Sequence, residues 1–332
     1  MIDDLSLHQK MILGVIIGDA KGAGDEFRYP DLTSYQNISI DKYIKSAYPD
    51  SENHPNHFPG MYTDDGQMSI AVSELLASNR EFNRENLAGK FIECYKRDPI
   101  AGYAKGFQKF LDSISTGKEF IEKIHSTSEK DGVTRNGAAM RSVPLGVVKD
   151  IDTVIEYAKI NASLTHNTPK GIASSVAVAL MSHISMYTGF IYRDRDVVRS
   201  VVIPEVKRID KETATYLNKV LDIDILKMRF NPLLLYGEEN YNKGVPCDAM
   251  RTVGAVVYLL TNFYDPKEIL DESIRLGGDV DSVASISLGI SLINDNIERL
   301  PSYLYNDLTN HEYGRDYVLS LGKKLEKKFP IK

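Results

Sequence analysis

The sequence predicts an all-α protein. Apolar residues recur at helical spacing along most of the 332-residue chain, and alternating strand patterns are scarce. Several apolar segments begin with a helix-capping residue that is followed by proline in the first turn. A chain of this length can bury a large core. It contains no repeat, low-complexity tract or linker that would divide it, so we expect a single domain over residues 1–332.

The first predicted helix combines an apolar stripe with a row of glycines. The stripe is formed by Leu7, Met11, Ile12, Val15 and Ile16. Gly14, Gly18 and Gly22 then recur at every fourth position. Glycines on one face of a helix indicate that another backbone packs closely against it, although some of them could end the helix.

Later helices are marked by their first residues. Asn83 precedes one apolar run, Thr168-Pro169 precedes another, and Asp265-Pro266 precedes a third. Helical spacing predicts further helices over about 66–79, 100–114, 139–149, 152–163, 247–261, 281–293 and 315–329. Residues 197–206 are rich in β-branched side chains and fit either a strand or a helix.

Two polar stretches interrupt these helices. Residues 30–60 and 115–138 are predicted to be long loops, and loops of that length are often functional lids. The first of them leads directly into an acidic motif.

Composition excludes several classes of protein. The net charge of −6, with scattered cations, argues against a nucleic-acid-binding protein. Cys94 and Cys247 are too few and too far apart for a disulfide framework, and they are predicted to be buried free thiols in a reducing compartment. The apolar run at residues 11–17 is too short to cross a membrane and lacks a basic flank, and we expect no other segment to be long and apolar enough to cross one. We expect no membrane association and a cytoplasmic protein.

Three groups of acidic residues stand apart from the surface charges. They are Asp19 with Asp25-Glu26, Thr63-Asp64-Asp65, and Asp279-Val280-Asp281-Ser282. Each group lies at the end of a predicted helix, where one acid could simply cap it. The third group contains more than a helix cap needs. It has two acids two residues apart, Asp279 and Asp281, which follow two glycines and precede the hydroxyl of Ser282.

Taken together, these groups indicate a site for hard divalent cations. Such cations prefer carboxylate, hydroxyl and carbonyl oxygens, and no Cys or His cluster accompanies the acids, which disfavours zinc. Two Asp pairs with Thr63 and Ser282 supply roughly enough oxygens for about two Mg²⁺ or Mn²⁺ ions. This pattern alone leaves the reaction open.

Five strings in order resemble motifs of the ADP-ribosylglycohydrolase family. They are Gly18-Asp19-Ala20 with Glu26, Tyr62-Thr63-Asp64-Asp65, Asn136-Gly137-Ala138-Ala139-Met140-Arg141, Leu164-Thr165-His166, and Gly277-Gly278-Asp279-Val280-Asp281-Ser282. The resemblance covers nearly the whole chain. It implies orthogonally packed helices around a binuclear Mg²⁺ site.

The resemblance also implies a function for each motif. The expected metal ligands are Thr63, Asp64, Asp65, Asp279, Asp281 and Ser282. Glu26 and Asp65 are expected to be catalytic, with Glu26 acting as a base or as a gate. The residues expected to contact ADP-ribose are Asn136, Gly137, Met140 and His166. The implied reaction is hydrolysis of the N- or O-glycosidic bond between ADP-ribose and a protein side chain or small conjugate.

Other interpretations stay open for this chain. It could hydrolyse another ribosyl or nucleotide conjugate, or bind ADP-ribose without catalysis. Asn136-Gly137 alone is typical of a plain turn, His166 of a helix cap or packed side chain, and Arg141 of an ion-pair partner for a core acid. Lys21 replaces a residue that is usually apolar in the family, and Arg135 stands where many members have glycine.

Overall fold

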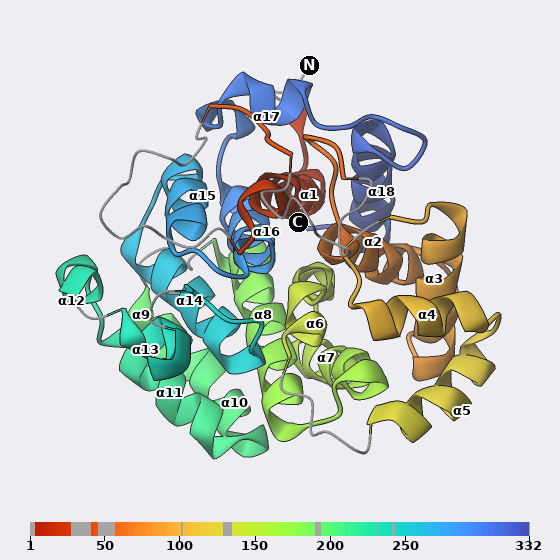
Figure 1. Ribbon diagram of the computed structural model, residues 1–332, viewed down its shortest axis with the longest axis horizontal. Helices are drawn as coiled ribbons and strands as arrows, with labels where there is room; N and C mark the ends of the chain where they lie inside the picture. Colours follow the sequence, from red (N-terminus) through yellow and green to blue (C-terminus); the bar gives the residue numbers. More distant parts are fainter. Residues whose placement is uncertain are drawn as a thin grey trace.

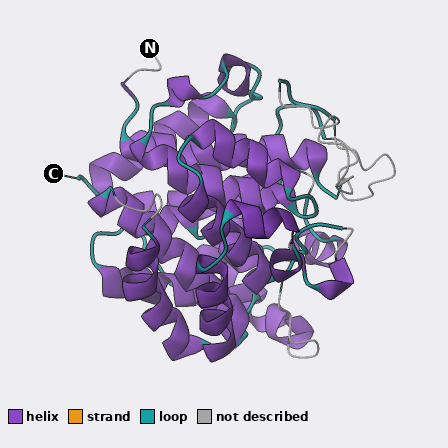
Figure 2. Ribbon diagram, turned by 90° about the vertical axis from the view of Figure 1, so that its left-hand side faces the viewer, coloured by secondary structure: helices purple, strands orange, loops and turns teal. Residues whose placement is uncertain are grey.

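A computed structural model shows an assembly of short helices that cross one another at steep angles (Figures 1 and 2). It describes residues 4–27, 41–45, 57–100, 102–128, 135–189, 194–230, 232–240 and 243–331. Within these ranges the extended structure is limited to two isolated β-bridges, Arg135 with Asp248 and Val245 with Gly278. The predicted all-α class is confirmed.

The helices follow one another in chain order, with a long connection between α1 and α2. They are α1 (Leu7–Asp25), α2 (Asp64–Ala77), α3 (Arg84–Arg97), α4 (Lys105–Ser113), α5 (Gly117–Ser128), α6 (Gly137–Met140), α7 (Ile151–Thr165), α8 (Pro169–Thr188), α9 (Arg195–Val197), α10 (Ile203–Ile209), α11 (Lys211–Leu221), α12 (Ile225–Phe230), α13 (Leu233–Tyr236), α14 (Ala249–Asn262), α15 (Pro266–Arg275), α16 (Val280–Ser291), α17 (Ser302–Asn306) and α18 (Arg315–Lys328). Short 3₁₀ or π turns occupy η3 (Val143–Val147), η4 (Val198–Val202), η5 (Glu238–Asn240), η6 (Leu292–Asn294) and η7 (Ile297–Arg299).

The predicted helix starts are confirmed by capping hydrogen bonds. The Asn83 side chain accepts from the backbone N–H of Asn86, and that of Thr168 accepts from Gly171. The Asp265 carboxylate accepts from two backbone N–H groups in the first turn of α15. These bonds satisfy donors that a helix leaves unpaired at its N-terminus, which is why such residues mark boundaries reliably.

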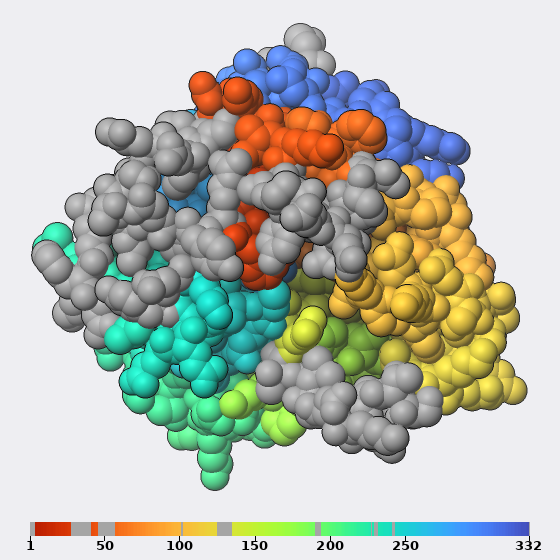
Figure 3. Space-filling view, in the orientation of Figure 1, coloured from red at the N-terminus to blue at the C-terminus, as the bar shows by residue number. Residues whose placement is uncertain are grey.

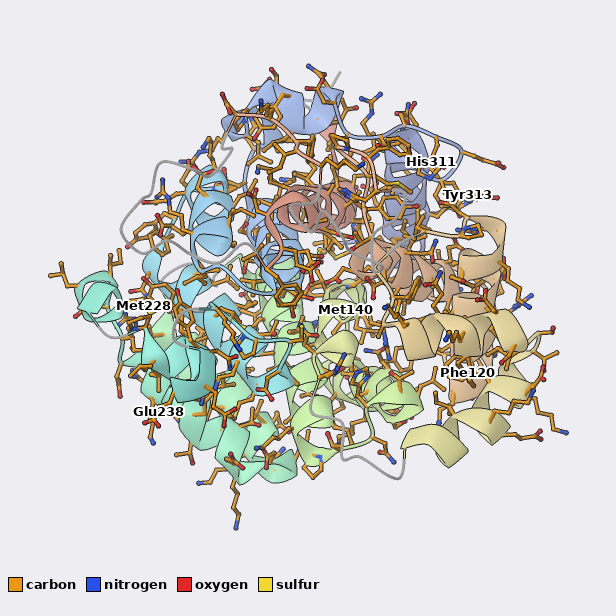
Figure 4. The ribbon with its side chains drawn as sticks, in the orientation of Figure 1. Phe120, Met140, Met228, Glu238, His311 and Tyr313 are labelled. Atoms are coloured by element: carbon orange, nitrogen blue, oxygen red, sulfur yellow. The ribbon has the colours of Figure 1, made fainter. Side chains whose placement is uncertain are left out.

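Two sequence-based expectations need correction, and one choice left open by the sequence is decided. Residues 139–149 do not form one helix, because Pro144 cannot continue α6 and the chain turns into η3 instead. Residues 115–138 are not one loop, since α5 lies there with Phe120 fully buried (Figure 4). Residues 197–206 are helical, passing through η4 into α10. Most of the loop predicted over 30–60 lies outside the described residues.

Helices α1 and α16 form the centre of the molecule and pack face to face (Figure 1). A Cβ atom at Gly18 would lie 2.3 Å from the carbonyl oxygen of Ala284, and one at Gly22 would lie 2.3 Å from the Cα of Asp281. Backbone atoms cannot give way as a flexible side chain can. The glycine row therefore has the close-packing role that its spacing predicted.

Helix α8 packs against α7 and α10. By length and composition alone, it could span a bilayer. The sequence-based expectation that no segment reaches this length and apolarity was wrong for α8. However, 78% of its most apolar 18-residue window is buried inside the protein. Its apolar residues are accounted for by packing against neighbouring helices.

Candidate metal and catalytic site

Three buried carboxylates meet where α1 ends and α16 begins. Oxygen atoms of Glu26, Asp279 and Asp281 all lie within 4.8 Å of one another. The backbone N–H of Phe27 donates to the carbonyl of Gly278 at 2.7 Å, which ties the end of α1 to the start of α16. Because α1 and α16 are also packed through glycines, the two motifs are held together without bulky side chains between them.

The double glycine before Asp279 is required by the backbone. Gly277 and Gly278 have φ values of +66° and +82°, a region that residues with a side chain rarely adopt. A Cβ at Gly278 would lie 2.1 Å from the carbonyl oxygen of Val245. The turn therefore brings Asp279 and Asp281 in against the segment that precedes α14.

Asp19 fixes the start of α2. Its Oδ2 accepts from the backbone N–H of Thr63 at 2.8 Å and from that of Gly66 at 2.7 Å. Its Oδ1 accepts from the Thr63 hydroxyl at 2.7 Å. Asp19 thus acts as an orienting residue for the Thr63-Asp64-Asp65 segment rather than as a cap of its own helix.

The three acidic groups form one electrostatic unit. The pKa of Asp64 is raised well above its usual range, first by burial and then by the charges of Asp19 and Glu26. Burial likewise raises the pKa of Asp281, with Glu26 as the next cause. Carboxylates this close compete for ionisation because each disfavours the charge of its neighbours. The charge of Asp279 also raises the pKa of Asp64, so the second and third acidic groups lie close together.

The donor set fits a divalent cation. Asp65 is 3% exposed, and its Oδ1 has no hydrogen-bond partner among the described residues. Burial raises the pKa of Asp65 well above its usual range, followed by the charges of Asp19 and Asp64. A buried acceptor without a donor is costly. A cation placed among these oxygens would satisfy it and relieve the repulsion.

Residues outside the acidic motifs complete the cluster. The Asn136 side-chain amide donates to Asp279 at 2.6 Å and to the Thr252 hydroxyl at 3.0 Å. Ser282, the last residue of the third acidic group, lies close enough to Asp65 to lower the pKa of that carboxyl. The structure thus brings Asn136, Ser282 and the predicted acids together.

Cys247 is a neighbour that the sequence analysis missed. It was predicted to be an inert buried thiol, and Cys94 is indeed buried. Cys247 is only partly buried and lies beside Asp279. Burial raises the pKa of the Cys247 thiol, and the charge of Asp279 raises it further. Its one sequence signal was its place immediately before Asp248, the N-cap of α14.

Two of the predicted ligand-contacting residues, Gly137 and His166, lie next to each other. The His166 ring packs against Gly137, where an added Cβ would be 2.7 Å from His166 Cε1. Met140 is 5% exposed and lies near the centre of the molecule (Figure 4). Arg141 is buried but pairs with no carboxylate among the described residues, so its interpretation as an ion-pair partner was wrong.

Figure 3 shows where this site meets the surface. The red segment containing α1 is visible near the middle of this face, recessed beside the cyan atoms of the α13–α14 region. Asp25 and Glu26, at the end of α1, are themselves buried, with 3% and 9% of their surface exposed.

The chain thus combines an all-α fold with a buried cluster of acids from the end of α1 and the start of α16. The model of the ADP-ribosylglycohydrolase family matches residues 4–330, and the chain belongs to this family. It is accordingly a glycosidase.

Individual relatives and structures support the same assignment. ADP-ribosylhydrolase ARH3 of Xenopus tropicalis is 25% identical over 325 residues, which cover 91% of this chain and 90% of that protein. The ADP-ribosyl-[dinitrogen reductase] glycohydrolase of Rhodospirillum rubrum is 26% identical over 189 residues, covering 54% of this chain and 58% of that protein. A solved structure titled ADP-ribosylglycohydrolase-related protein complex shares the fold, with a TM-score of 0.66 at 15% identity over 97% of this chain and 98% of its own.

Proposed function

We propose that the protein uses about two Mg²⁺ ions, or Mn²⁺ in their place, to hydrolyse the bond between the anomeric carbon of ADP-ribose and an acceptor. The acceptor is a protein side chain or a small conjugate. The observation that carries the proposal is the cluster of Glu26, Asp279 and Asp281, beside which Asp19 holds the Thr63-Asp64-Asp65 segment. Asp65 in that segment keeps a buried oxygen without a hydrogen-bond partner among the described residues. Membership of the family supplies the class of substrate.

The metal ligands would be the six residues named by the motifs, and Glu26 is close enough to join them. They are Thr63, Asp64, Asp65, Asp279, Asp281 and Ser282. Bound cations would orient the ribose diol and a water molecule and would neutralise the crowded carboxylates. Thr63 is already oriented by Asp19, and Asp279 by Asn136.

The protein's own groups account for the remaining chemistry. Cleavage breaks the bond between the anomeric carbon and the acceptor atom and develops positive charge on the sugar, which nearby carboxylates stabilise. The oxygen of a water molecule forms the new bond, and its proton passes to the Glu26 carboxylate. The same proton then passes from Glu26 to the departing acceptor, so that the products are free ADP-ribose and the protonated acceptor. Asn136, Gly137 and His166 hold the remainder of the ligand beside this centre.

A panel assay tests the proposal. Purified protein is incubated with arginine-, serine- and cysteine-linked ADP-ribosylated proteins and with small ADP-ribose conjugates, and free ADP-ribose is measured. We expect release from at least one substrate, loss of release in EDTA, and recovery with Mg²⁺ or Mn²⁺. The matched control is Asp281→Asn, which keeps the side-chain shape and should be inactive.

Two outcomes would contradict the proposal. Full activity in EDTA would exclude the metal assignment. Tight ADP-ribose binding with no release from any substrate would favour the non-catalytic alternative.

A further inference from the structure

A chain of hydrogen bonds connects a buried arginine to the histidine beside the acidic cluster. Arg141 Nη2 donates to the Thr165 hydroxyl at 2.7 Å. The Thr165 hydroxyl in turn lies 2.7 Å from Nδ1 of His166. Arg141 and His166 belong to separate motifs in the sequence, 25 positions apart, and Thr165 joins them.

Arg141 is rigidly held and has no role as a ligand of its own. It is 1% exposed, its guanidinium lies 4.7 Å from the centre of the Phe91 ring, and it donates to the side chain and carbonyl of Asn161 at 2.6 and 2.9 Å. It also donates to the carbonyl of Gly137 at 2.9 Å. A guanidinium with this many fixed bonds cannot reorient to bind a substrate, but it can direct its neighbours.

The direction of the bonds determines the state of the histidine. A guanidinium only donates, so the Thr165 oxygen accepts from Arg141. The Thr165 hydroxyl proton then has one acceptor among the described residues, which is His166 Nδ1. A nitrogen that accepts carries no proton, and the neutral imidazole must therefore carry its proton on Nε2.

The surrounding charges keep the ring neutral. Burial, followed by the positive charges of Arg141 and Arg135, lowers the pKa of His166 to about 3. The ring is thus uncharged at physiological pH. Its Nε2 has no hydrogen-bond partner in the described part of the chain, and the residue keeps partial exposure.

The free nitrogen lies at the edge of the candidate site. An added Cβ at Gly137 would be 3.0 Å from His166 Nε2, so the ring edge lies against that glycine. The preceding residue, Asn136, bonds Asp279 directly. The His166 ring thus contacts Gly137, and the neighbouring Asn136 contacts Asp279, a proposed metal ligand.

We infer that Arg141 and Thr165 are positioning residues that fix His166 as the neutral Nε2–H tautomer, which donates a hydrogen bond to a phosphate oxygen of the bound ligand. The choice of phosphate follows from matching roles: Nε2–H can only donate, and phosphate oxygens only accept. A ribose hydroxyl would match either tautomer and would not need the relay. The ligand part of this inference rests on the proposed function, whereas the tautomer part does not.

Nitrogen NMR tests the tautomer without ligand or metal. Protein labelled with ¹⁵N-histidine is examined by long-range ¹H–¹⁵N correlation, and the His166 signals are assigned from their loss in His166→Gln. We expect a single neutral tautomer with an unprotonated Nδ1. Thr165→Val should convert this pattern to a mixture, and Thr165→Ser should restore it.

A matched control separates this effect from the loss of any buried hydroxyl. Thr261→Val removes a hydroxyl that donates to the carbonyl of Val257 inside α14, and it should leave the His166 signals unchanged. Calorimetric titration with ADP-ribose in Mg²⁺ should show weaker binding for Thr165→Val by the factor by which the Nε2–H tautomer is depopulated in its spectrum, about twofold for an equal mixture. Thr165→Ser and Thr261→Val should bind as the wild type does.

The results that overturn the inference are distinct from those that overturn the proposed function. A wild-type spectrum with the proton on Nδ1, or Thr165→Val with an unchanged spectrum, would refute the relay. An unchanged affinity with a changed spectrum would refute the donor role. A wild-type protein that fails to bind ADP-ribose would refute the proposed function and the ligand part, while the spectrum still decides the tautomer.

Discussion

The contact between α1 and α16 offers a sharp test of how the fold positions the site. In Gly22→Ala the new methyl group would lie 2.3 Å from the Cα of Asp281 and 2.6 Å from its backbone nitrogen. Real Cβ atoms do not approach backbone this closely, so the two helices must separate. Overpacking of a core costs about 1–3 kcal/mol, and we expect the upper end because no flexible side chain can move aside.

A matched substitution isolates the steric term. Gly89 lies inside α3, and a Cβ there would meet nothing within 4 Å. Gly89→Ala should therefore stabilise the protein by about 0.4–1 kcal/mol, because alanine restricts the unfolded chain without strain.

Urea unfolding followed by circular dichroism measures both variants. The midpoint should fall for Gly22→Ala and rise slightly for Gly89→Ala. Because the displaced backbone carries Asp281, Gly22→Ala should also lose most of its stabilisation by Mg²⁺ with ADP-ribose. If Gly22→Ala unfolded at the wild-type midpoint and kept that stabilisation, the proposed role of the glycine contact would be wrong.

Three further predictions follow from the same site. Lys21 and Asp25, the residue before Glu26, form a buried ion pair at 3.0 Å. Lys21→Met leaves the Asp25 charge buried without its partner and should lower the free energy of unfolding by about 3–5 kcal/mol in thermal or urea unfolding. A double variant that adds Asp25→Leu should recover much of the loss. Glu26→Gln should slow turnover far more than it weakens ADP-ribose binding by calorimetry, and equal losses would indicate a purely binding role. The folded-state pKa values of Asp64 and Asp65 are raised, so the folded state binds more protons than the unfolded state above their usual pKa. In EDTA the melting temperature should therefore rise as the pH falls from about 7 toward about 5, and Mg²⁺ should abolish that rise; a pH-independent melting temperature in EDTA would contradict the electrostatic description.

Local chemistry explains what the sequence predicted correctly. Asp265 and Thr168 cap their helices through bonds to residues two or three positions away, so the pattern contains both partners. The glycine row needed only its spacing to indicate a close helix contact. The acidic groups could be picked out by residue type and flanking glycines, and the structure brings Glu26, Asp279 and Asp281 together.

Contacts between distant segments explain what was missed. Cys247 reaches Asp279 only because the turn at Gly278 packs on Val245, a pairing that no local pattern encodes. The partners of Arg141 are an amide, carbonyls and a hydroxyl rather than an acid, which residue type alone does not reveal. Helix α5 was hidden by the polar residues that flank its few buried positions.

The measurement that tests the central claim most directly is a crystal structure of the protein grown with Mn²⁺, with anomalous data collected at the manganese edge. Two bound metal ions would give two strong peaks, about 4 Å apart, between the segments that contain Asp65 and Asp281. An anomalous map without peaks among these carboxylates, or with manganese bound elsewhere, would contradict that claim.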